Sequence, residues 1–85
     1  MTLEEAAPEQ LEDHELDRVL YELESEEAEL SARRRRLHDR LASFPNEVAQ
    51  QQEREISAHR RALHVRIDAL RAERSRRREN AAHDD

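Results

Sequence analysis

Apolar residues in the first half of the chain recur every seven positions. One heptad position, labelled d, is apolar throughout: Leu16, Leu23, Leu30, Leu37 and Phe44. The a position between them mixes apolar and charged residues: Leu20, Glu27, Arg34 and Leu41. A leucine at every seventh residue predicts an amphipathic helix of the coiled-coil type.

The second half repeats this pattern after a break. Its d positions are Ile56, Leu63 and Leu70, and its a positions are Glu53, Arg60 and Ile67. Pro45 disfavours helical backbone at the preceding residue and ends the first helix near residue 44. Ser43 or Asn46 can cap the second helix. Two helices with so short a connection predict an all-α antiparallel hairpin.

Boundaries follow from the same signals. Pro8 and Glu9 suit the first turn of a helix. No apolar seam continues after Arg71. We therefore expect a flexible acidic leader over residues 1–8, helices over 9–44 and 45–75, and a flexible tail over 76–85.

The composition limits the core. Of the 85 residues, 42% are charged, and the chain has no Gly and no Cys. So small an apolar complement calls for a second copy, a partner or a ligand, and we expect a homodimeric helical bundle. No apolar run approaches 18 residues and the N-terminus is acidic, which predicts a cytoplasmic protein with no membrane partner.

The net charge of −6 hides an asymmetry. Residues 1–30 hold twelve acids and one base, whereas residues 31–78 hold fourteen arginines and six acids. Antiparallel packing would bring these opposite charges together. A pI near 5.4 argues against direct DNA binding.

A polar stripe stands out in the second helix: Glu53, Ser57, Arg60, His64 and Asp68. At 100° per residue these five side chains fall within about 80° of one another, beside the apolar seam. The stripe recurs 26 residues earlier as Glu27, Ser31, Arg34 and His38, with Ala42 in the place of Asp68. Nine of the eighteen positions in 27–44 and 53–70 are identical, which indicates a duplication.

Two interpretations of the stripe remain open. In one, charged a positions form a ladder of salt bridges that sets the helix register. In the other, the stripe binds an anion. If residues whose numbers sum to about 91 face each other, Arg34 and Arg60 lie within about one helical turn of each other. Their guanidinium groups then repel each other unless an anion lies between them. Arginine also pairs with guanine O6 and N7 or with phosphate, and a carboxylate can accept the remaining guanine N–H groups.

The spacing Glu-x3-Ser-x2-Arg-x3-His-x3-Asp resembles the signature of the RsiG anti-sigma factors of actinobacteria, which bind cyclic di-GMP. Four residues match it: Glu53, Ser57, Arg60 and Asp68. His64 stands where the family has Gln, and Ala42 breaks the first copy. The resemblance implies a helical hairpin that holds an intercalated dimer of cyclic di-GMP and, when liganded, sequesters a WhiG-type sigma factor.

The resemblance also suggests roles. Arg60 and Asp68 would read guanine, and Glu53, Ser57 and His64 would complete the base and phosphate contacts. The first copy would bind secondarily, or is a decayed duplicate kept for packing. Because only one copy is complete, we expect a homodimer whose two second helices supply the two motifs. The alternative is a single hairpin that uses both copies.

Other functions fit less well. We expect no catalysis, because the chain lacks a pocket-forming core and a Gly-rich loop. We expect no metal site, since His38 and His64 lack a second histidine one turn away. A generic coiled-coil adaptor is the alternative function. The remaining polar side chains are expected at the surface, solvated or facing the sigma factor: Arg33, Arg35, Arg36, Arg61, Arg66, His14, His59 and His83. Four residues off the seam were further candidates for that contact: Leu3, Leu11, Val19 and Tyr21.

Overall fold

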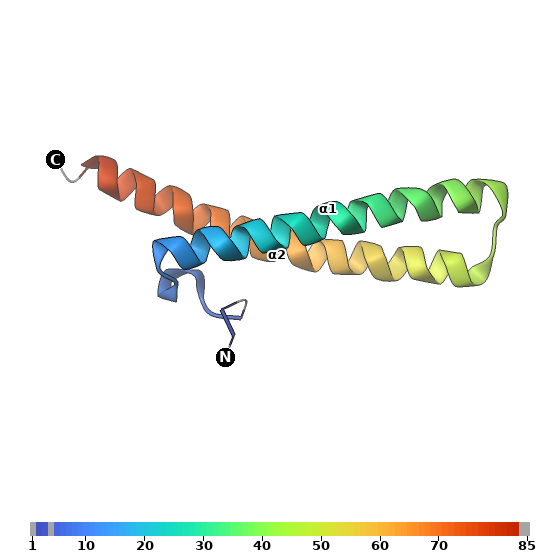
Figure 1. Cartoon of the computed structure of the whole chain (residues 1–85), viewed down its shortest axis with the longest axis horizontal. Coiled ribbons are helices and arrows are strands. Elements are labelled where there is room, and N and C mark those ends of the chain that lie inside the picture. The colour runs from blue at the N-terminus through green and yellow to red at the C-terminus, as the bar shows by residue number, and fades with distance from the viewer. Residues whose placement is uncertain (1, 4, 84–85) are drawn as a thin grey trace.

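The chain folds as an antiparallel pair of long helices, seen in a computed structural model that describes residues 2, 3 and 5–83 (Figure 1). A short 3₁₀ turn, η1 (Pro8–Gln10), precedes α1 (Asp13–Ser43), and α2 (Glu47–His83) returns along it. The hairpin measures 60 × 27 × 15 Å. The predicted all-α hairpin is confirmed, and the described residues contain no strand.

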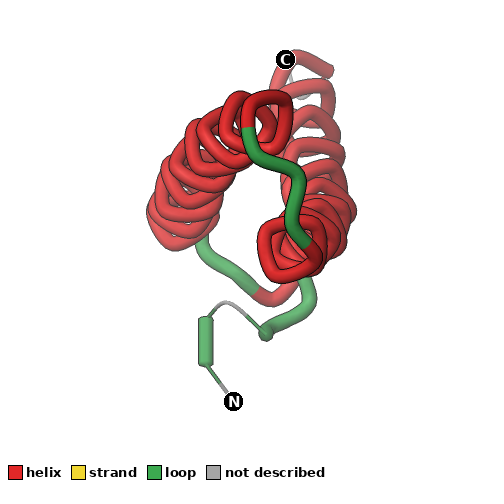
Figure 2. The backbone as a smooth tube through the Cα atoms, turned by 90° about the vertical axis from the view of Figure 1, so that its right-hand side faces the viewer, coloured by secondary structure: helices red, strands yellow, loops and turns green. Residues whose placement is uncertain are grey.

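The turn between the helices forms where the sequence predicts it. Phe44 is extended (φ −140°, ψ 83°), as expected before a proline. Asn46 then caps α2, because its side-chain Oδ1 accepts a hydrogen bond from the Ala49 N–H at 2.8 Å. Figure 2 views the molecule from this end, with the connection crossing between the two helices.

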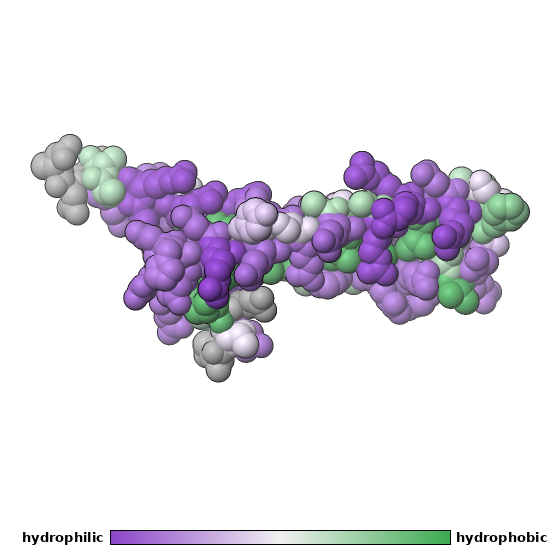
Figure 3. Space-filling view, in the orientation of Figure 1, coloured by the Kyte–Doolittle hydropathy of each residue, from purple (hydrophilic) through white to green (hydrophobic). Residues whose placement is uncertain are grey.

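The core is the predicted seam between the helices. The buried apolar residues of the two helices are Leu16, Val19, Leu20, Leu23, Leu30 and Leu37 from α1, and Ala49, Ile56, Leu63, Ile67 and Leu70 from α2. Phe44 was predicted to extend this seam, but it is 75% exposed. The helix has ended by that residue, so its side chain no longer points along the seam. The face of the molecule seen in Figure 3 is mostly hydrophilic.

The helix boundaries differ from the predicted ones at both ends. Helix α1 begins at Asp13 rather than at residue 9, since Leu11 turns inward and is only 4% exposed. The Arg77 guanidinium donates hydrogen bonds to the carbonyls of Pro8 (3.2 Å) and Leu11 (2.6 Å). These contacts hold the segment before α1 against α2 in a non-helical path.

Helix α2 continues to His83, whereas the sequence predicted its end near residue 75. Glu73, about one turn beyond Leu70, is buried, at 7% exposure. Its carboxylate accepts hydrogen bonds from Arg76 and, at 2.7 Å, from Arg77. Ion pairs between residues three or four positions apart stabilise a helix. They stabilise the last part of α2, where the apolar seam is missing. Figure 1 shows α2 running past the start of α1.

Within the described residues, neither helix is apolar enough over a sufficient length to cross a membrane.

Candidate functional site

The complete motif lies along one edge of α2, beside the buried seam. Glu53, Ser57 and Arg60 are half-buried, whereas His64 and Asp68 are exposed. This gradient follows from the heptad. The a positions Glu53 and Arg60 point toward α1, and Asp68 lies farthest from the seam. The stripe is therefore continuous from the seam to the solvent.

The first copy lies on α1, directly across from the second. Glu27, Ser31 and Arg34 are half-buried and His38 is exposed, as in the complete copy. Ion pairs join residues 27 with 64, 38 with 53 and 17 with 74, and each pair of numbers sums to 91. The predicted register is confirmed, and the two copies are related by an approximate two-fold axis.

Glu27 from the first copy receives the basic side chains of the second. Arg60 Nε donates to Glu27 Oε1 at 3.1 Å, and Arg60 Nη2 lies at 3.1 Å from the same oxygen. His64 Nε2 lies 3.2 Å from it. Both Glu27 and Arg60 are mostly buried side chains, 20% and 25% exposed. One carboxylate thus engages two of the five residues of the complete motif.

Glu53 of the second copy makes the reciprocal contacts. His38 Nε2 lies 3.1 Å from Glu53 Oε1, and Arg34 Nε lies 3.6 Å from it. From the sequence, Arg34 and Arg60 were expected to repel each other unless an anion lies between them. In the structure the two glutamates of the motif itself provide that negative charge. The salt-bridge ladder considered from the sequence is therefore present.

The two halves of this network are not equal. Ser31 donates a hydrogen bond to Glu27 at 2.8 Å, while Ser57 makes no such bond to Glu53 among the described residues. Arg34 Nε is buried and has no hydrogen-bond acceptor within reach, since its distance to Glu53 exceeds hydrogen-bonding range. The Glu27 half is thus the more tightly bonded one.

The pKa of the Glu27 carboxyl lies below its ordinary value of 4.5. The hydrogen bond from Ser31 is the largest cause. Hydrogen bonds from Arg60 and His64, with the charge of Arg60, act in the same direction, and partial burial opposes them. These donors favour the ionised carboxylate, so Glu27 is a stable anion at neutral pH.

Asp68 stands apart from the network. It is exposed on α2 and forms no ion pair with any described residue. Ala42, its counterpart in the first copy, is also exposed. The structure therefore joins the Glu, Arg and His of each copy, with Ser31 added on the first copy. It leaves the fifth position, where the copies differ in residue type, open to solvent.

The neighbouring polar residues divide into two groups. Arg33, Arg35, Arg36 and Arg61 are exposed, as are His14 and His59, and the side chain of His83 lies outside what the structure describes. Arg66 was expected to be solvated or to face the sigma factor. It instead donates to the backbone carbonyl of Ala6 at 2.6 Å. No group of three or more side chains within residues 2, 3 and 5–83 could hold a metal ion.

The candidates for a sigma contact also change. Leu11 and Val19 are buried, at 4% and 1% exposure, and Leu3 packs against the same core. Only Tyr21 of those four remains exposed, at 74%. The heptad pattern did not predict the burial of these three residues, because Leu3 and residues 5–11 cover the end of the seam. Nothing in the local pattern places Arg66 and Arg77 on backbone carbonyls more than fifty residues away.

The model of a protein family described as RsiG-like matches residues 45–85. The matched range contains α2 and the whole complete motif, and it excludes the first copy. No curated protein and no solved structure matches the chain. The classification inferred from the spacing of five residues is thus confirmed for this segment.

Proposed function

Because residues 45–85 are of RsiG type, we propose that this chain is an anti-sigma factor controlled by cyclic di-GMP. The family match indicates an anti-sigma-factor-type regulator. In the proposed mechanism, the α2 motif binds cyclic di-GMP. The liganded protein then sequesters a WhiG-type sigma factor in the cytoplasm and keeps it from RNA polymerase.

The observation that carries this proposal is the position of the complete stripe. Its five side chains run along one edge of α2, inside the RsiG-like segment, and its outer members His64 and Asp68 reach solvent. The Arg60 guanidinium suits guanine O6 and N7 or a phosphate. The Asp68 carboxylate can accept from the guanine N1–H and N2 amino groups. Glu53, Ser57 and His64 supply the remaining polar contacts to base and phosphate.

Assembly completes the proposed site. An intercalated dimer of cyclic di-GMP presents two similar faces and needs two similar walls. The first copy has Ala42 where a carboxylate is required, so it is a poor second wall. We propose a homodimer in which the α2 helices of two chains face the ligand. A single hairpin, with Glu27, Ser31, Arg34 and His38 as secondary ligand contacts, is the alternative.

Titration calorimetry with cyclic di-GMP and, separately, with GTP tests the ligand. We expect cyclic di-GMP to bind and GTP to bind at least tenfold more weakly. Arg60→Ala and Asp68→Ala should each weaken cyclic di-GMP by roughly tenfold or more, the usual loss for one charge-assisted contact. Equal affinity for both nucleotides, or unaltered binding in both variants, would refute this function.

Analytical ultracentrifugation tests the assembly. With saturating cyclic di-GMP we expect the mass of two chains. A liganded species with the mass of one chain, 10.1 kDa, would instead favour the single hairpin. Size-exclusion chromatography of a WhiG-type sigma factor with and without ligand then tests sequestration, which should require cyclic di-GMP.

A coiled-coil adaptor is the second candidate function. The reciprocal pairs of Glu27 with Arg60 and of Glu53 with Arg34 favour it, because charged a positions commonly set register. Such an adaptor would not need Asp68, which pairs with no described residue. The Asp68→Ala titration therefore separates the two functions.

A further inference from the structure

The contacts of Glu27 bear on how the proposed ligand site is controlled. This carboxylate receives the Nε and Nη2 groups of Arg60, which form one of the edges through which a guanidinium makes paired hydrogen bonds. It also lies 3.2 Å from His64 Nε2. A guanine or phosphate using the same edge of Arg60 would need the positions that Glu27 occupies.

Charge strengthens this conflict. Glu27 is held in its ionised form by Ser31 and Arg60, and its side chain is 20% exposed. A phosphate brought to Arg60 would stand close to that carboxylate in a partly desolvated place, where like charges repel strongly. The ligand cannot simply be added to this arrangement, so Glu27 must give way.

We infer that Glu27 is an internal counter-ion that competes with cyclic di-GMP for Arg60 and His64, and thereby sets the ligand affinity. This inference rests on the proposed function and assigns the first copy a role other than ligand contact. The degenerate copy keeps the complete motif ordered and neutral until the ligand displaces its glutamate. The loss of an acid at Ala42 is compatible with this role, because position 42 takes no part in the contacts.

Calorimetry of Glu27→Gln against the unaltered chain tests the inference, with Glu29→Gln as the matched control. Glu29 lies on the same helix, is exposed and pairs with no described residue. We expect Glu27→Gln to bind cyclic di-GMP about fivefold more tightly, as suits the loss of one competing ion pair, and Glu29→Gln to bind unchanged. Glu27→Asp, which keeps the charge on a shorter side chain, should be intermediate. Circular dichroism verifies the helices of each variant.

The outcomes separate the inference from the function. Weaker or equal binding by Glu27→Gln, with binding by the unaltered chain, would overturn the inference and leave the function standing. Binding by Glu27→Gln alone would support it. No binding by any variant would overturn both.

A second, independent feature is a basic groove near the turn. Arg33, Arg36 and Arg40 from α1 line a hollow of about 220 Å³ with Leu37 and with Gln52 from α2. None of these three arginines forms an ion pair with a described residue. By contrast, eight other arginines form ion pairs or donate hydrogen bonds to backbone carbonyls: Arg18, Arg34, Arg60, Arg66, Arg71, Arg74, Arg76 and Arg77. Three arginines that form no ion pair with a described residue therefore line this one groove.

Two exposed apolar residues lie at the turn, close in sequence to the residues that line this groove. Phe44, just past the end of α1, is 75% exposed, and Val48, in the first turn of α2, is 70% exposed. Figure 3 shows hydrophobic atoms at the turn end of the molecule. Arginine with an aromatic residue is typical of protein interfaces. Nucleic acid is a poorer fit, because the whole chain carries a charge of −6 and an apolar rim offers nothing to a phosphate backbone.

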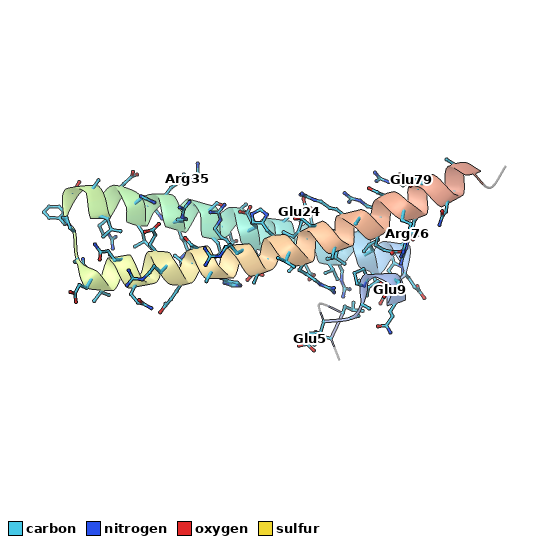
Figure 4. The ribbon with its side chains drawn as sticks, turned by 180° about the vertical axis from the view of Figure 1, so that it is seen from behind. Glu5, Glu9, Glu24, Arg35, Arg76 and Glu79 are labelled. Atoms are coloured by element: carbon cyan, nitrogen blue, oxygen red, sulfur yellow. The ribbon has the colours of Figure 1, made fainter. Side chains whose placement is uncertain are left out.

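The geometry points to the turn end, Arg33 to Gln52, as a docking surface for an acidic protein segment that also carries apolar side chains. On the proposed function, that segment belongs to the sigma factor. The test is the double variant Arg36→Glu/Arg40→Glu. Arg35→Glu/Arg61→Glu is the control, with the same charge change outside the groove. Arg35 projects outward from α1, away from α2 (Figure 4).

Affinity for a purified WhiG-type sigma factor is measured at saturating cyclic di-GMP, together with ligand affinity. We expect the groove variant to lose at least tenfold in sigma binding, with cyclic di-GMP binding retained and the control unaltered. Equal losses in both double variants would overturn the docking surface. The docking surface would also be overturned if the unaltered chain bound duplex DNA and only the groove variant lost this binding. That result would assign the groove to nucleic acid. Absence of sigma binding by the unaltered chain would overturn the proposed anti-sigma function and, with it, the docking surface.

Discussion

At the scale of single residues, Glu27 organises the polar centre of the hairpin. Three side chains approach its carboxylate: Ser31 from one turn along α1, and Arg60 and His64 from α2. A charged a position costs stability unless it is paired. Here the pairing is reciprocal, since Glu53 receives Arg34 and His38. Polar residues in the seam thus fix the register that the leucines alone would leave free to slide.

This arrangement makes stability depend on pH. The pKa of Glu27 is lowered in the folded chain, so its stabilising effect is complete above the ordinary value of about 4.5 and is lost as the pH falls through the lowered pKa. We expect Glu27→Gln to unfold at lower urea than the unaltered chain at pH 7, and the difference to vanish in acid. Urea unfolding from pH 2.5 to 7 measures it. A pH-independent difference would contradict the assignment, and Glu29→Gln is the control.

At the scale of elements, Arg77 joins three parts of the chain. It bonds Glu73 within α2, Asp13 at the start of α1 (2.8 Å), and the carbonyls of Pro8 and Leu11. Arg66 attaches Ala6, which precedes Pro8, to α2 through a hydrogen bond to its backbone carbonyl. The segment before α1 is therefore attached to α2 through charged donors on carbonyl acceptors, and Leu11 is buried as a result.

We expect Arg77→Ala to destabilise the fold by about 1–3 kcal/mol, because buried carbonyls and Glu73 lose charged donors. Amide hydrogen exchange should accelerate most at residues 5–11. The matched control is Arg78→Ala, an exposed neighbour without an ion pair to a described residue. Similar effects of both substitutions would show that the attachment contributes nothing.

The turn offers a second test at this scale. Asn46→Ala removes the acceptor for the Ala49 N–H and should cost about 1 kcal/mol in urea unfolding. Asn46→Asp keeps a capping oxygen and should preserve stability. If Asp were as harmful as Ala, the cap would not be the cause.

At the scale of the whole molecule, the most completely buried side chains gather toward one end of the hairpin. Leu16, Leu20, Ile67 and Leu70, near the covered end, are at most 2% exposed. Leu30, Leu37 and Leu63, nearer the turn, are 7–9% exposed. Two helices alone cannot enclose a seam, and the segment before α1 adds a third layer at one end only. The remaining length is the part that a second chain or a ligand would cover.

This difference in burial predicts unequal effects of one substitution at two equivalent heptad positions. Leu70→Ala should cost about 3–5 kcal/mol and Leu37→Ala about 1–2 kcal/mol, since the loss grows with the completeness of burial. Urea unfolding of both variants measures this. Equal costs would mean that the seam is uniformly covered in solution, as in a dimer that buries the turn end as well.

The local sequence determined the helices, their connection and their register. Leucines seven residues apart, Pro45 and the capping Asn46 act over a few residues, so their consequences can be worked out without the fold. The duplicated motif also placed four residues of each copy on facing edges, because a helix has a fixed angular step. The spacing of five residues in α2 was enough to predict that this segment is RsiG-like.

Only the tertiary structure decided which charges pair. The sequence places Arg34 near Arg60, but the side-chain directions on facing helices give each arginine to the other copy's glutamate. The fold of residues 5–11 and the burial of Leu11 likewise depend on contacts across more than forty residues. Arg66 and Arg77 make those contacts with backbone carbonyls. The pattern of side chains along the sequence does not show which carbonyls can accept such hydrogen bonds.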